Sequence, residues 1–144
     1  MNIQSMIRVG VVSDRSVERC AVRVIFEGQD QMVSDWLPVV QPLAGRARFF
    51  ALPDVGDSVI CLFLGTGLET GFCAGMYYAG GAVPAASGNT IGVWLPGGNY
   101  VELDQSTGSL AVQATGGVSI TAPAVSITGN LSVSGSITRG GVSI

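Results

Sequence analysis

Asp54 and Asp57 stand three residues apart, and paired carboxylates are the groups that glycosidases use as acid and base. The surrounding segment 53–57 (Pro-Asp-Val-Gly-Asp) predicts a turn, in which an Asp side chain caps the neighbouring backbone. The chain contains no histidine and no lysine, so neither a Ser-His-Asp triad nor a Ser-Lys pair can form within it. These residue types favour a structural role over hydrolysis, and we predict that the protein is not an enzyme.

Two glycine-containing segments, 65–67 (Gly-Thr-Gly) and 97–98 (Gly-Gly), are candidate phosphate loops. Neither continues into Gly-Lys-Ser/Thr or opens a predicted helix, so both are interpreted as turns.

The three cysteines, Cys20, Cys61 and Cys73, are widely spaced, and Cys61 lies in an apolar run typical of a small buried residue. Without a histidine or a CxxC pair, the chain is predicted to hold no metal ion and no cofactor.

All seven basic residues are arginines, and two of them, Arg46 and Arg48, stand beside the aromatic pair Phe49-Phe50. Arginine next to aromatic side chains is one way in which barrel folds bind single-stranded nucleic acid. The formal net charge of −3 leaves no basic surface overall, so we predict no nucleic-acid partner. The segment is interpreted as a protein-docking loop or as part of an intersubunit ion pair.

The first 80 residues contain the elements that would position most of these side chains. Five strand-like stretches alternate with turn signals, and only residues 39–50 are interpreted as irregular or briefly helical. Five short strands in a segment of this length are typical of a small closed or half-closed barrel. The predicted strands span residues 6–13, 19–26, 33–37, 58–64 and 71–78.

Residues 81–107 are predicted to form a linker or collar of small residues, followed by a first hairpin. The hairpin strands are expected at 90–95 and 100–103, because residues 96–99 (Pro-Gly-Gly-Asn) carry a turn signal.

Residues 108–144 repeat an apolar pair every six to eight residues, with Ala, Ser or Thr between the two members. This alternation puts the apolar side chains on one face of each strand. Each strand is too short to form a core alone, whereas a stacked repeat can form one continuous core. The predicted core residues are Leu110, Val112, Val118, Ile120, Val125, Ile127, Leu131, Val133, Ile137, Val142 and Ile144.

A single copy of this repeat cannot offset the entropy that it loses when its backbone is ordered. Strands intertwined from several chains would bury the apolar faces and also pair the exposed strand edges. The low content of charged residues, 12%, likewise indicates surface that is covered by other subunits. We therefore predict a homotrimer whose residues 108–144 form an intertwined triple-stranded β-helix, or trimeric β-prism.

Five short segments, together with the β-repeat that follows them, resemble the baseplate assembly protein V family. These proteins are the central spikes of contractile phage tails and of related bacteriocins. The order and spacing of the segments carry the resemblance, which covers nearly the whole chain. The segments are 8–12 (Arg-Val-Gly-Val-Val), 19–24 (Arg-Cys-Ala-Val-Arg-Val), 36–40 (Trp-Leu-Pro-Val-Val), 53–59 (Pro-Asp-Val-Gly-Asp-Ser-Val) and 75–78 (Gly-Met-Tyr-Tyr).

The resemblance implies an all-β chain with an N-terminal OB-fold-type barrel over residues 1–80 and a spike over 108–144. It implies a homotrimer that is assembled in the bacterial cytoplasm, sits at the virion tail tip or baseplate and docks on the tail hub through its N-terminal end. On tail contraction this membrane-piercing needle would puncture the host outer membrane. Family tips often carry a His-x-His motif that binds an ion, and this chain has no histidine. We expect either that the tip is missing or that a capping protein binds near Ile144.

Two alternative functions stand beside the spike. A trimeric carbohydrate-binding or adhesin module would require an exposed aromatic groove, for which Tyr100 in the first hairpin is the clearest candidate. A β-helix acyltransferase would require a more regular six-residue period, and such enzymes commonly use a catalytic histidine that this chain lacks.

Overall fold

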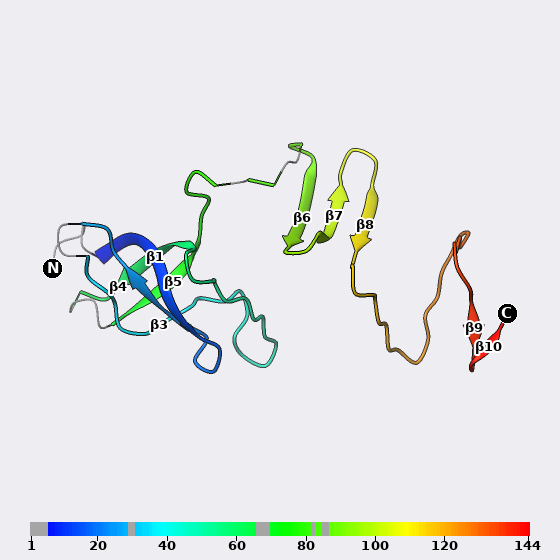
Figure 1. The fold of residues 1–144 in the computed structure, drawn as a ribbon, viewed down its shortest axis with the longest axis horizontal. Coiled ribbons are helices and arrows are strands. Elements are labelled where there is room, and N and C mark those ends of the chain that lie inside the picture. The colour runs from blue at the N-terminus through cyan, green and yellow to red at the C-terminus, as the bar shows by residue number, and fades with distance from the viewer. Residues whose placement is uncertain (1–5, 29–30, 66–69, 82, 85–86) are drawn as a thin grey trace. The chain divides into compact units, whose positions relative to one another are not determined.

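The structure is a computed structural model that describes residues 6–28, 31–65, 70–81, 83–84 and 87–144 (Figure 1). The described residues form ten β-strands, which confirms the predicted all-β class. They fall into two compact units, residues 1–83 and residues 84–144. The finer division into 1–80, 81–107 and 108–144 stays a prediction. Much of the predicted turn at 65–67, and part of the predicted collar, lie outside the described residues.

The N-terminal unit contains one antiparallel five-stranded sheet with the strand order β3-β2-β1-β4-β5. A parallel bridge between Val39 and Cys73, with Val40 N–H donating to the Cys73 carbonyl at 2.9 Å, brings its two ends together. The result is a nearly closed barrel, as the OB-type prediction requires. The strands are β1 (Ile7–Ser16), β2 (Ala21–Ile25), β3 (Leu37–Pro38), β4 (Ser58–Phe63) and β5 (Gly71–Met76).

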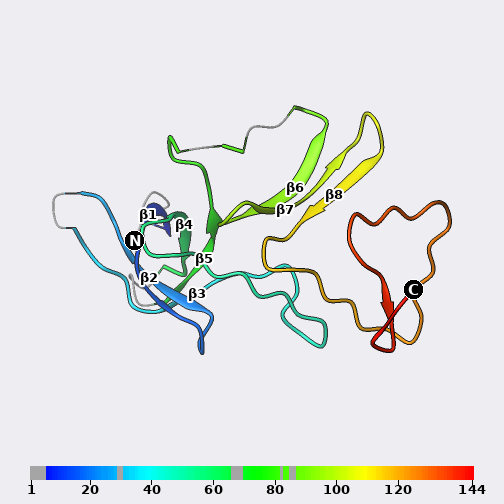
Figure 2. The same cartoon turned by 45° about the vertical axis from the view of Figure 1, so that its right-hand side comes forward.

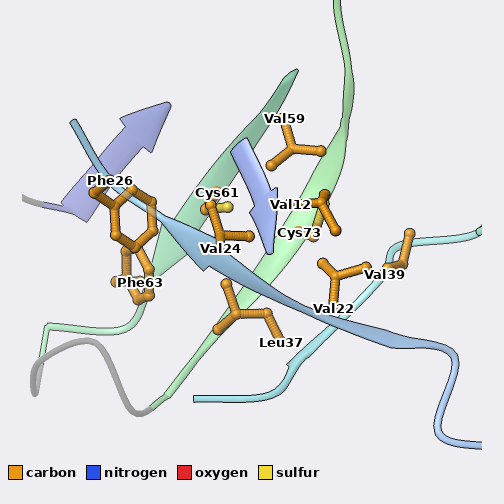
Figure 3. Packing of buried hydrophobic residues seen from close by; sticks show 10 residues of the cluster. All are labelled: Val12, Val22, Val24, Phe26, Leu37, Val39, Val59, Cys61, Phe63 and Cys73. Carbon is orange, nitrogen blue, oxygen red and sulfur yellow. The ribbon is translucent and has the colours of Figure 1, made fainter. Parts of the chain in front are cut away.

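Alternation along β1, β2 and β4 places every second side chain inside this barrel (Figure 3). Phe26 and Phe63 meet edge to face with ring centroids 5.6 Å apart, and the Arg8 guanidinium lies 4.5 Å from the Phe26 centroid. The cluster contains Cys61, as its apolar context predicted. Its members are Val12, Val22, Val24, Phe26, Leu37, Val39, Val59, Cys61, Phe63 and Cys73.

The predicted strand at 33–37 is the main error within the barrel, because only Leu37–Pro38 pairs as a strand there. Ser34 is fully buried, and its hydroxyl accepts a hydrogen bond from Val24 N–H at 3.0 Å. The same hydroxyl donates to the Asp35 carbonyl at 2.7 Å. A side-chain oxygen thus takes the place of a backbone carbonyl, and the ladder is interrupted. The segment 39–50, interpreted as irregular or briefly helical, is irregular.

Gly10 lies where β1 passes so close to β2 that no side chain fits. An added Cβ atom would lie 2.5 Å from the Ile25 carbonyl oxygen and 2.6 Å from Val24 Cγ1. We expect Gly10→Ala to lower the free energy of unfolding by about 1–3 kcal/mol, because the strands must move apart. Urea unfolding followed by circular dichroism measures this change. Gly45→Ala is the control, since its Cβ would meet nothing within 4 Å. Equal midpoints for the two variants would contradict the close strand approach.

The C-terminal unit begins with a three-stranded antiparallel meander, β6 (Thr90–Leu95), β7 (Asn99–Asp104) and β8 (Ser109–Gln113) (Figures 1 and 2). The predicted hairpin is confirmed, and both glycines of its turn, Gly97 and Gly98, have positive φ angles of 83° and 81°. A second, very short hairpin joins β9 (Thr138–Arg139) to β10 (Val142–Ser143).

Candidate assembly surface

One face of the β6–β7–β8 sheet carries two rows that consist only of apolar side chains. Its register aligns Ile91 with Leu103 and Leu110 in one row, and Val93 with Val101 and Val112 in the next. Five of the six side chains are exposed, from 45% for Val101 to 64% for Leu110. A contiguous apolar surface on a sheet marks an interaction site, because water disfavours it.

The opposite face of the same sheet is polar, and its side chains hydrogen-bond to one another. Trp94 Nε1 donates to Glu102 Oε2 at 3.2 Å, and the Tyr100 hydroxyl donates to Gln113 Oε1 at 3.4 Å. Trp94 and Tyr100 are also cross-strand partners. The sheet is therefore amphipathic, and the polar groups of its two aromatic residues are engaged within the sheet itself.

The turn after β7 is held by Asp104, whose carboxylate accepts hydrogen bonds from the Ser106 hydroxyl at 2.6 Å and from Ser106 N–H at 2.9 Å. These bonds lower the pKa of Asp104 below its ordinary value, with the Ser106 hydroxyl making the larger contribution. The charged carboxylate thereby fixes the return from β7 to β8, and so the register of the apolar rows.

The sequence predicted only part of this apolar face. Leu110 and Val112 were among the predicted core residues, whereas Ile91, Val93, Val101 and Leu103 were missed. The signal was present in the alternation of residues 90–95 and 100–103, which predicts a hairpin and also places Ile91, Val93 and Val101 on one face.

After β8 the chain continues without strand pairing until β9 (Figure 2). Residues 118–136 are all described, and within this stretch the chain forms no backbone–backbone hydrogen bond with itself. Unpaired backbone groups must bond to water or to another chain. The strands expected at 118–133 therefore have no strand partner among the described residues of a single copy.

The eleven predicted core residues are all exposed in the single chain. The exposed fraction of their side chains runs from 42% for Ile137 to 80% for Ile144. Every side chain of the buried cluster belongs to the N-terminal unit, among the residues that the structure describes. The structure places these eleven residues along one continuous stretch but does not bring them together, so the shared core stays a prediction.

The barrel also has an apolar strip on its outer face. Ile7, Leu62 and Phe72 form one cross-strand row over β1, β4 and β5, and Val9 lies opposite Ile60 in a neighbouring row. Ile7, Val9, Leu62 and Phe72 are between 40% and 53% exposed. This second surface was not predicted, because residues 59–64 form one continuous apolar run, in which inward-facing and outward-facing positions have the same residue types.

The paired carboxylates at 54 and 57 belong to a turn, as predicted. Asp57 Oδ2 accepts a hydrogen bond from Asp54 N–H at 2.7 Å, and Gly56 between them has a φ angle of +97°. The Asp54 carboxylate also forms an ion pair with Arg15. Both groups are engaged in holding the chain, and no acid–base geometry results.

The loop that carries Arg46 and Arg48 is exposed. Phe49 and Phe50 beside them are 58% and 59% exposed.

Across the described ranges, no three or more His, Cys, Asp or Glu side chains gather where they could hold a metal ion. None of the described elements is a helix long and apolar enough to cross a membrane.

Comparison with known proteins agrees with the barrel of the N-terminal unit. Residues 8–78 match the family described as the type VI secretion system/phage-baseplate injector OB domain. The chain is also 30% identical over 136 residues to the spike protein of Escherichia phage P2, an alignment that covers 87% of this chain. The chain spans 62% of the length of that phage protein.

Proposed function

Because the chain belongs, through residues 8–78, to the family of type VI secretion system and phage-baseplate injector OB domains, we propose that it is a structural spike protein of a phage-tail baseplate. A structural role agrees with the absence of histidine and lysine, and with carboxylates that are engaged in turns. The chain works by assembly and not by catalysis.

One observation carries this proposal: the C-terminal unit exposes an apolar sheet face and an unpaired backbone that it cannot cover itself. Two further copies would supply both missing partners. Their strands would pair with the backbone of residues 118–136, and their apolar faces would close around a shared axis. The product is a homotrimeric, intertwined β-helix over residues 108–144, whose core is formed by the eleven apolar residues predicted from the sequence.

Such a rod suits a part that carries axial load. Its three chains would have to separate together before it yielded, and its low charge would ease passage into a host outer membrane. The barrel would form the other end and dock on the tail hub, for which the outer strip containing Ile7, Leu62 and Phe72 offers apolar surface.

Sedimentation equilibrium and small-angle X-ray scattering on the purified chain test the proposal. Three chains of 14.7 kDa give an expected mass of 44.1 kDa, with an elongated rod projecting from a wider head. A compact particle of one chain's mass would overturn the spike. If the chain is a trimer, a second experiment tests the piercing step. In it, trimers fixed to beads are pressed against vesicles of outer-membrane lipid, and the release of an enclosed dye is measured.

A further inference from the structure

Two buried cysteines face each other across the barrel wall. Cys61 on β4 and Cys73 on β5 are direct partners in the antiparallel ladder. Both side chains are completely buried, whereas Leu62 and Phe72 beside them point outward and are about 40% exposed. The thiols therefore share one rung and one face, inside the cluster that Figure 3 shows, and both are reduced in this structure.

Neighbouring hydrogen bonds show whether the Cys61–Cys73 rung is a hydrogen-bonded or a non-hydrogen-bonded pair of the ladder. Leu64 N–H donates to the Thr70 carbonyl at 3.1 Å, so the 64–70 rung is hydrogen-bonded. Rungs alternate along an antiparallel ladder, which makes the Cys61–Cys73 rung a non-hydrogen-bonded one. The Cys73 carbonyl agrees independently, because it accepts from Val40 N–H at 2.9 Å on the side away from β4.

This type of rung brings side chains closest together. Its Cα atoms are typically about 4.5 Å apart, within the range of roughly 4.4–6.8 Å that a disulfide spans. A β-bulge follows at once, since Ile60 pairs with Gly75 and leaves Ala74 as an extra residue. The bulge gives this part of β5 freedom to adjust when a bond forms.

We propose that Cys61 and Cys73 are an oxidative modification site, which forms an intrachain cross-strand disulfide on exposure to a disulfide oxidant. One thiolate attacks the oxidant's S–S bond and forms a mixed disulfide, and the second thiol then displaces the remaining oxidant sulfur. Two S–H bonds and the oxidant's S–S bond break, and one protein S–S bond forms. The oxidant accepts the two electrons and the two protons and leaves as two thiols.

The same geometry makes the bond slow to form and easy to reduce. The hydrogen bond between the two thiols, together with burial, raises the pKa of Cys61, whereas the same hydrogen bond lowers the pKa of Cys73. Cys73 is therefore the thiol that attacks the oxidant, and the complete burial of both side chains slows the oxidant's approach. A Cα separation at the short end of the disulfide range strains the product and favours its reduction. If the proposed function is right, the pair stays reduced in the cytoplasm and oxidises after release of the particle.

Incubating the purified full-length chain with excess oxidised glutathione tests the site. We expect intact mass spectrometry to show the loss of two hydrogens per chain, with no retained glutathione. Chymotrypsin should then give a cross-linked pair of peptides, because it can cut at Phe63 and Phe72 between the two cysteines. A dithiol reductant should restore the original mass. Trypsin is unsuitable, since residues 49–138 contain no lysine or arginine.

Two variants make the assignment specific. Cys20→Ala should keep the mass loss, whereas Cys73→Ala should abolish it. Three free thiols after exposure, in a chain whose circular dichroism still shows the folded barrel, would overturn the proposal. So would a cross-link that contains Cys20. Sedimentation of the same samples separates this result from the spike: a trimer without the bond overturns only the disulfide, and a monomer with it overturns only the spike.

Discussion

Replacing Ile127 with aspartate is expected to abolish assembly and leave single chains of 14.7 kDa in sedimentation equilibrium. In one copy the Ile127 side chain is 59% exposed, so the substitution should cost the lone chain little. At a shared dry axis, three carboxylates would meet without partners, and the penalty for burying them would prevent closure. Val125→Asp should have the same effect, because Val125 is two residues away on the same predicted face.

Ser126→Asp is the matched control, because alternation places residue 126 on the opposite, solvent face of the same strand. It adds the same charge to the same stretch and should leave assembly intact. Circular dichroism of the barrel should be unchanged in all three variants. Full assembly of the Ile127 variant would exclude the dry axis. Loss of assembly in the Ser126 variant would show that an added charge anywhere in this stretch is enough to prevent assembly.

Phe26→Ala is expected to lower the free energy of unfolding of the barrel by about 3–5 kcal/mol. Phe26 is 1% exposed, packs edge to face on Phe63 and is covered by the Arg8 guanidinium, so truncation leaves a cavity that rigid strands cannot close. A small domain has only about 5–15 kcal/mol of stability, so the loss is severe. The midpoint of urea unfolding measures it.

Phe49→Ala serves as the control, since it removes the same ring from an exposed loop, where 58% of the residue is accessible. Its unfolding midpoint should stay close to that of the unmodified chain. A similar shift in both variants would mean that the loop ring is as well packed as Phe26, in contradiction to the barrel core described above.

Alternation and turn chemistry were enough to predict most of the strands. They placed β4 and β6 within one residue of their observed ends, and residues 53–57 were correctly interpreted as a turn. The buried position of Cys61 followed from its apolar neighbours. These features depend on contacts between residues that are close in sequence, or on a period that a single strand displays by itself.

Features that depend on distant partners were not predictable in this way. The bond from Val40 to Cys73, which brings the ends of the barrel sheet together, joins residues that no local pattern relates. Ser34 replaces a backbone acceptor with its hydroxyl, and its residue type does not reveal this. Only two of the six residues in the apolar rows of the β6–β8 sheet were predicted, because the rows become apparent only when the register of all three strands is known.

Among the described residues, the barrel has a buried core and residues 87–144 have none, and this difference has a consequence for how the protein matures. The barrel can fold as soon as its own residues leave the ribosome, at a rate that does not depend on how many chains are present. If the C-terminal unit closes only against other copies, its folding is a reaction of higher order. Dilution should then slow it while leaving the barrel unaffected, and neighbouring ribosomes on one message would supply the local excess of chains that it needs.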